Sequence, residues 1–147
     1  MSGGFDDYLD ERKPTKWLDE EQCWQRIEGA PYGRLATAVG SEPDLFPVNH
    51  RVDDDRSIVF RTSPGSKLLQ ILIDARVAFE VDGYDDEEVW SVVVKGFAAE
   101  VLENEEVAGA STLGVDPWTP EAQQKDRWVR IFPREVTGRS FERPRED

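Results

Sequence analysis

The sequence has very few of the side chains on which most protein chemistry depends. Its 147 residues include one cysteine, Cys23, and one histidine, His50. A single cysteine cannot form an internal disulfide, and these two residues cannot build a Cys/His metal cluster. We therefore expect no metal site, and a lone unpaired cysteine is typical of a reducing, cytoplasmic location.

Long apolar runs and an excess of basic residues are also missing. The longest apolar stretches, such as 92–94, are far too short to span a bilayer, and the first residues do not read as a signal peptide. Asp and Glu number 31 against 18 Lys and Arg, a formal net charge of −13. Such a field would repel nucleic acid, so we expect neither a nucleic-acid nor a membrane partner. A small phosphate ligand is not excluded, because a local basic cluster can outweigh the mean charge.

The apolar residues are distributed as in a single domain. We expect residues 17–141 to form this domain, and the polar ends 1–16 and 142–147 to be flexible. A helix is predicted near its start, with Asp19 as the N-cap and Gly29 at the end.

Most of the remaining domain alternates apolar and polar residues with the period of two that is typical of strands. The predicted strands are 33–39, 45–52, 58–62, 76–81, 89–102 and 128–133, with a further short one within 135–141. Short links between the first three favour an antiparallel meander, and Gly96 is predicted to mark a bend or bulge in the fifth.

Three further helices and an acidic loop are expected around the strands. Two of the helices are expected over 64–73 and 103–112, and the third is expected to begin at Thr119. The acidic loop is expected over 82–88. The buried side of the helix over 64–73 is predicted to be Leu68, Leu69, Ile71 and Leu72. Antiparallel strands with short links and peripheral helices predict a mainly β fold whose sheet closes into a barrel.

The segment from Arg61 to Lys67 has the clearest chemical pattern. A strand end, a Pro-Gly turn and a helix start would bring free backbone N–H groups close to the hydroxyls of Ser63 and Ser66. A lysine near the positive end of a helix dipole is unfavourable unless an anion lies beside it. The pattern therefore allows two interpretations, ordinary solvated surface charge and a small anion site.

Other candidate residues each have a structural reading as well. His50 is the only side chain that ordinarily titrates near neutral pH, although a single histidine on a strand face is more often structural. Asn49 is expected on the opposite face, where its amide could bind the edge of a heteroaromatic ring. Trp128 could stack on a planar ligand, anchor a dimer or belong to the core. Cys23 lies on the apolar side of the predicted helix, which argues against covalent catalysis.

Five segments, in their order and spacing, resemble the pyridoxamine 5′-phosphate oxidase-like family in its small actinobacterial-type branch. They are APYGRLAT, PDLFPVNHRVDDDRSIVFRTSPGSKL, VAFEVDG, WSVVVKGFAAEV and WVRIFPREVTGRSF. The resemblance covers 17–141 and implies a six-stranded antiparallel split β-barrel. It also implies a homodimer with FMN, or in some branches a deazaflavin, at the subunit interface.

The resemblance further implies which residues hold the phosphate. Ser66 and Lys67 match the family's basic phosphate-binding pair, with serine where arginine is common. Arg61 is therefore expected to complete the phosphate clamp. Thr62 matches a hydroxyl residue at the strand end that contacts the cofactor.

Contacts to the flavin ring follow in the same way. Val48 and Asn49 match the strand whose backbone runs along the isoalloxazine, and Ser91 takes the place of a glutamine that touches the flavin in the true oxidases. Trp128 and Arg130 match a tryptophan and an arginine near the partner subunit's cofactor. The full set of groups that binds pyridoxal phosphate is not matched, so we do not expect pyridoxamine phosphate oxidation.

The sequence thus predicts an FMN-binding oxidoreductase that acts on an unidentified small molecule, with no dedicated catalytic residue assigned. A deazaflavin-dependent reductase is one alternative, mildly disfavoured because that cofactor adds negative charge to an acidic protein. A non-catalytic flavin carrier and a dimeric interaction module without ligand are the others.

Overall fold

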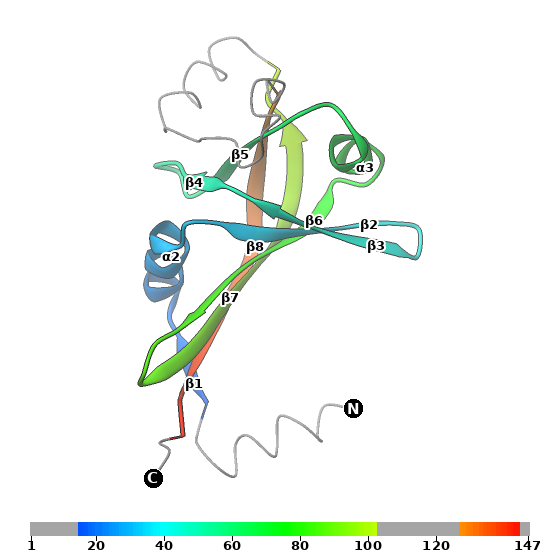
Figure 1. Cartoon of the computed structure of the whole chain (residues 1–147). Helices are drawn as coiled ribbons and strands as arrows, with labels where there is room; N and C mark the ends of the chain where they lie inside the picture. The colour runs from blue at the N-terminus through cyan, green and yellow to red at the C-terminus, as the bar shows by residue number, and fades with distance from the viewer. Residues whose placement is uncertain (1–14, 103–126, 145–147) are drawn as a thin grey trace.

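Eight strands and two helices make up the described part of the chain, residues 15–102 and 127–144 of a computed structural model (Figure 1). The strands are β1 (Lys16–Leu18), β2 (Gly33–Val39), β3 (Glu42–Val48), β4 (His50–Val52), β5 (Ile58–Thr62), β6 (Arg76–Tyr84), β7 (Glu88–Glu100) and β8 (Arg127–Glu142). The helices are α2 (Glu20–Gly29) and α3 (Ser66–Ile73). Neither helix is long and apolar enough to span a bilayer.

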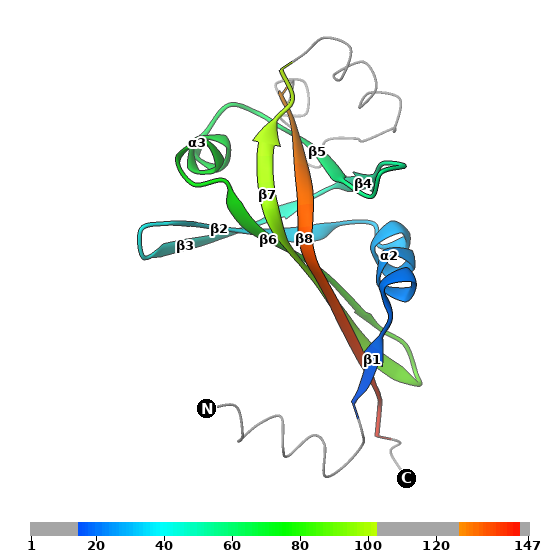
Figure 2. The same cartoon turned by 180° about the vertical axis from the view of Figure 1, so that it is seen from behind.

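All eight strands form one antiparallel sheet. Its order is β3-β2-β6-β7-β8-β5-β4, and β1 pairs with β8 beside this path. The two edge strands, β3 and β4, are consecutive in the chain and separated only by Asn49. Because one continuous backbone joins both edges, the sheet must curl, as Figures 1 and 2 show. The predicted mainly β, barrel-like fold is confirmed, with eight strands instead of six.

The antiparallel pairings predicted by the meander of the first three strands are confirmed, but its middle strand is not continuous. The segment 45–52 breaks at Asn49 into two strands, of which β3 pairs with β2 and β4 pairs with β5. The other neighbour of β2 is β6, and that of β5 is β8. Pro47 lies in the edge strand β3, the position in a sheet where a residue without an N–H is usually tolerated.

Several predicted boundaries also change. The segments 128–133 and 135–141 form one strand, β8, and Tyr84 pairs with Val89, so most of the predicted loop 82–88 is a β-hairpin. The strand β1 was not predicted, and it includes Lys16. The helices predicted over 103–112 and from Thr119 lie outside the described residues.

The core fills the inner face of the curled sheet. Phe79, Val92, Val94 and Ile131 are fully buried there, together with Trp24 and Ile27 of α2 and Leu68 and Ile71 of α3. Asp19 caps α2 through a reciprocal capping box with Gln22, as the sequence predicts for the cap.

The buried side predicted for α3 is half wrong. Leu68 and Ile71 face the core, whereas Leu69 and Leu72 are 57% and 63% exposed. At about 100° per residue, positions 68 and 71 share the side that faces the sheet, and an eight-residue helix buries only one such stripe.

The predicted irregularity at Gly96 is confirmed as a β-bulge between β7 and β8. Lys95 lies opposite Glu135 and Gly96 opposite Pro133, so Arg134 is the extra residue of β8. A Cβ atom at Gly96 would stand 2.2 Å from the carbonyl oxygen of Phe132. The bulge therefore requires glycine at this position.

Replacing Gly96 with alanine is expected to destabilise the fold by about 1–3 kcal/mol, the usual range for overpacking against rigid neighbours. The measurement is the free energy of unfolding in urea. Gly29→Ala is the matched control, because nothing lies within 4 Å of a Cβ atom there. Equal stability of the two variants would show that the ladder can relax around the extra methyl group.

Candidate functional site

The candidate site lies on the face of the sheet that points away from the core, which we call the outer face. Antiparallel partners share a face, so the register fixes its members. In β7 they are Ser91, Val93, Lys95, Phe97 and Ala99; in β6, Arg76, Ala78, Glu80 and Asp82; in β8, Trp128, Arg130, Phe132, Glu135, Thr137 and Arg139; in β2 and β5, Ala36 and Arg61. Four of the predicted site residues, Arg61, Ser91, Trp128 and Arg130, therefore share one face.

Arg61 and Trp128 form a cation–aromatic pair at one end of this face. They lie opposite each other in the β5–β8 ladder, and the guanidinium carbon of Arg61 is 5.3 Å from the centroid of the Trp128 ring. Among the described residues, the buried Nε of Arg61 has no hydrogen-bond partner. A buried donor without an acceptor is costly, so this end of the sheet suits an anion.

Lys67 approaches the end of β5 from the other side of the sheet. Its Nζ lies 5.4 Å from the ring centroid of Phe46 and 5.9 Å from that of Phe60. Phe60 is completely buried in the core and precedes Arg61 in β5. The two basic residues therefore flank the strand end, and the structure does not stack them on the same aromatic group.

Thr62 and Val48, two further predicted cofactor residues, are buried. Thr62 is 3% exposed, and its hydroxyl donates to the carbonyl oxygen of Ser63 at 3.3 Å. Val48 belongs to the core, and Asn49 is the half-buried joint between the edge strands. Ser66 is the first residue of α3, and its side chain is outside the described atoms. Only backbone groups of Val48 are thus available to a ligand.

Arg130 is already engaged within the chain. Its Nη1 donates to Asp53 Oδ2 at 2.9 Å and to the Ser57 hydroxyl, and its side chain is only 12% exposed. The hydrogen bond from Ser57 and the nearby Arg130 charge lower the pKa of Asp55, against a smaller opposing effect of burial. Arg130 therefore holds the β4–β5 turn against β8, and its cofactor contact stays a prediction.

Ser91 lies far from the Arg61 end of the same chain. It pairs with Arg139, whereas Arg61 pairs with Trp128. The pairs Ser91–Arg139 and Arg61–Trp128 are eleven residues apart along β8, which at about 3.3 Å per residue is on the order of 30 Å. One chain therefore does not bring Ser91 and Arg61 into a single site.

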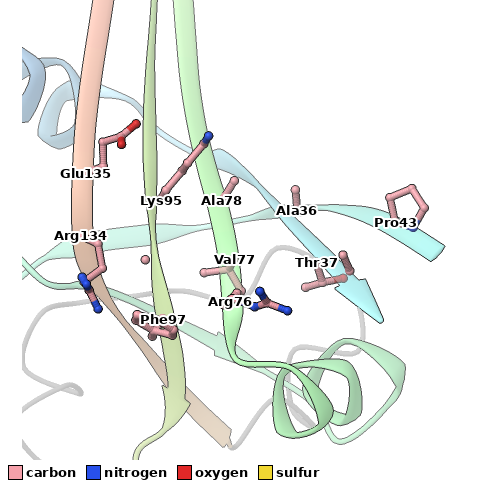
Figure 3. Close-up of a pocket in the computed structure, with 12 residues that line it drawn as sticks. Ala36, Thr37, Pro43, Arg76, Val77, Ala78, Lys95, Phe97, Arg134 and Glu135 are labelled. Carbon is pink, nitrogen blue, oxygen red and sulfur yellow. The ribbon is translucent and has the colours of Figure 1, made fainter. Parts of the chain in front are cut away.

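A hollow of about 530 Å³ lies between these two ends of the outer face (Figure 3). Ala36, Ala78 and Gly96 lie along it, Phe97 and Arg134 lie together on one side, and Lys95 and Arg76, of which Arg76 pairs with Asp74, also line it. Sequence reasoning missed this hollow. The apolar–polar alternation around Lys95 is visible in the sequence, but the bulge that aims Arg134 depends on the pairing of β7 with β8.

Comparison with known proteins identifies the family. A sequence model described as pyridoxamine 5′-phosphate oxidase matches residues 19–140. The chain belongs to this family. Within it, the chain is 35% identical to the protein Rv0080 of Mycobacterium tuberculosis over 128 residues, 82% of each chain.

Two solved structures of related proteins have the same fold. A candidate pyridoxamine 5′-phosphate oxidase of Corynebacterium glutamicum is 37% identical, with a TM-score of 0.80 over 90% of this chain and 96% of that one. A FAD binding protein of Mycobacterium smegmatis is 34% identical, with a TM-score of 0.74 over 87% and 99% of the two chains. The predicted split-barrel fold and the resemblance to the family are both confirmed.

His50 has a structural role in this pyridoxamine 5′-phosphate oxidase family member. The residue is 2% exposed, its Nε2 donates to the carbonyl oxygen of Ile27 at 2.8 Å, and its ring meets Phe79 edge-on. Burial lowers the pKa of His50, outweighing the hydrogen bond to Ile27, which acts in the opposite direction.

The described residues contain no group of three or more ligands that could hold a metal ion.

The buried, neutral state of His50 predicts a loss of stability on mild acidification. The unfolded chain takes up a proton near the ordinary pKa of 6.5, whereas the folded chain resists protonation to lower pH. Between about pH 7.5 and 5.5 the free energy of unfolding is expected to fall, by at most about 1.4 kcal/mol per pH unit for one proton. His50 is the only histidine, so His50→Gln should flatten the slope. An unchanged slope in urea titrations would contradict this reading.

Proposed function

We propose that this chain binds a flavin nucleotide on the outer face of its sheet and acts as a flavin-dependent oxidoreductase on a small molecule. The observation that carries the proposal is Arg61, with its buried Nε lacking a partner among the described residues and its guanidinium held over Trp128. A phosphate oxygen would satisfy that donor and would face a full positive charge. The residues present therefore fit the phosphate group of a flavin.

Membership of the family and the related FAD binding protein of M. smegmatis support the flavin. FMN is the flavin expected from the sequence, and FAD is the alternative that this relative favours. A bound flavin supplies hydride or electron transfer, and the chain's own residues bind and orient it. Arg61 and Lys67 would hold the phosphate, and the backbone from Val48 to Asn49 would lie along the ring.

A titration with three cofactors distinguishes the flavin proposal from the deazaflavin-dependent reductase and from the non-catalytic flavin carrier. Purified protein is titrated with FMN, FAD and a deazaflavin, and bound flavin is then tested for reduction by NAD(P)H and for turnover with electron acceptors. Binding of the deazaflavin alone would replace the flavin proposal. Flavin binding without any turnover would leave a carrier as the function.

Arg61→Ala is expected to weaken FMN binding about 10- to 100-fold, the usual value of a hydrogen bond to a charged group. Lys67→Ala should weaken it by a smaller or similar factor, with little change in thermal stability. Arg143→Ala is the matched control. This arginine directly follows β8, at the end of the strand far from Arg61, and its guanidinium lies over the ring of Tyr84. Flavin fluorescence quenching measures the affinity, and equal quenching by all three variants would rule out the Arg61 site.

We further propose that a second copy of the chain completes the site. Ser91 and Arg61 share the outer face but lie on the order of 30 Å apart along the strands, which is beyond the reach of one flavin ring and its phosphate. In a homodimer with two-fold symmetry, Ser91 of one copy can meet Arg61 of the other. The sheet face between them is uncovered by either described helix, both of which pack on the inner face.

Mixing two defective variants tests this arrangement. Arg61→Ala removes one half of the site and Ser91→Trp blocks the other, so neither homodimer should bind flavin well. Co-expression should restore binding at about a quarter of the sites, since random pairing gives half heterodimers with one intact site each. No recovery in co-purified heterodimers would place both residues in the same copy or would remove Ser91 from the site.

A further inference from the structure

His50 is a buried polar residue beside the joint that connects the two edge strands. It follows Asn49 directly, begins β4 and pairs with Phe60 of β5, the residue before Arg61. In the proposed flavin site the backbone 48–49 lies along the ring and Arg61 holds the phosphate. His50 therefore lies between the two segments on which that site depends, with its own side chain buried.

One hydrogen bond ties this histidine to α2, which lies beside β4 (Figures 1 and 2). The Nε2 atom of His50 is 2.8 Å from the carbonyl oxygen of Ile27. A carbonyl oxygen can only accept, so Nε2 donates. Ile27 belongs to the last turn of the helix, where carbonyl oxygens are short of intrahelical donors. The contact thus joins the end of α2 to the start of β4.

The position of β4 depends on few contacts. The strand has three residues, lies at an edge of the sheet and pairs with one neighbour, β5. A short strand with few partners is a low-stability part of a fold. The neighbouring strand β5 differs, because all five of its residues also pair with β8. Loss of the bond to Ile27 should therefore displace the Asn49 joint more than it displaces Arg61.

The second ring nitrogen of His50 makes histidine a poor choice for packing alone. Its Nδ1 is buried and has no hydrogen-bond partner among the described residues. A buried acceptor without a donor lowers stability, and an apolar ring at this place would not have that penalty. The ring meets Phe79 edge-on, with 4.9 Å between the centroids, a contact that a phenylalanine would also make. The bond from Nε2 to Ile27 is thus what distinguishes histidine from an apolar ring here.

We propose that His50 is a positioning residue of the flavin site. Through its bond to Ile27 it holds the joint at Asn49, and with it the backbone 48–49 along which the flavin ring lies. The inference rests on the proposed function, and it adds a residue that acts without touching the flavin. The part of the flavin that His50 governs is the ring. The phosphate end depends on Arg61, which the pairing of β5 with β8 holds in place.

Titration of the full chain with FMN and with riboflavin, which has the same ring and no phosphate, tests this role. His50→Phe keeps an aromatic ring and removes the donor. It should weaken the binding of both flavins by the same factor, about 3- to 10-fold, the usual value of one neutral hydrogen bond. His50→Gln keeps an N–H donor and should bind both flavins more tightly than His50→Phe does. Arg61→Ala should weaken the binding of FMN alone.

Cys23→Ser is the matched control for a general loss of stability. Cys23 is buried in the same helix, and its Sγ faces Leu18 and Gly138. This variant should have a lower melting temperature and unchanged affinity for both flavins. Should His50→Phe not fold, His50→Asn takes its place with the same expectation, because the shorter amide does not reach the carbonyl oxygen of Ile27.

Three results would overturn the inference. They are a folded His50→Phe variant with normal affinity for both flavins, a loss of affinity confined to FMN, and an equal loss in Cys23→Ser. The proposed function fails by a different result, in which the unaltered chain binds neither flavin, and this inference would fail with it. FMN binding that is insensitive to Arg61→Ala, but is weakened together with riboflavin binding by His50→Phe, would move the phosphate site and keep His50 in its role.

Discussion

The joint at Asn49 is the constraint on which the rest of the structure depends. It connects β3 and β4, which occupy the two edges of the sheet, by a single residue. Covalent connection of both edges forces the curl, and the curl gives the sheet one enclosed face and one open face. Both described helices bury their apolar sides on the enclosed face. The charged and aromatic side chains that could bind a ligand, such as Arg61 and Trp128, consequently lie on the open face.

The position of Arg61 depends on a set of polar contacts around β4 and β5. Arg130 binds Asp53 and Ser57 in the turn between these strands, Arg56 in the same turn pairs with Glu21 of α2, and His50 binds the last turn of α2. The Arg130 contacts are mostly shielded from water, so they stabilise more than an exposed ion pair would. Together they fix the strand that carries Arg61 to both the helix and β8.

Local patterns in the sequence predicted much of the fold, because they depend on neighbouring residues alone. The period of two located most strands, Asp19 was found as a cap, and Gly96 was found as an irregularity. Pairing between distant strands is a non-local property, which is why the split of the middle strand at Asn49 and the pairing of β5 with β8 were not predicted. The resemblance assigned both Ser91 and Arg61 to a cofactor site at a subunit interface, and nothing local in the sequence reports their separation of eleven residues along β8.

The bulge gives β8 two different frames of side-chain alternation. Before it, the odd positions Val129 and Ile131 face the core; after it, the even positions Gly138 and Ser140 do. An insertion or deletion of one residue on either side would turn an entire half-strand inside out, whereas a substitution alters a single site. Relatives of this protein can therefore be compared residue by residue along β8 only when both halves are aligned separately.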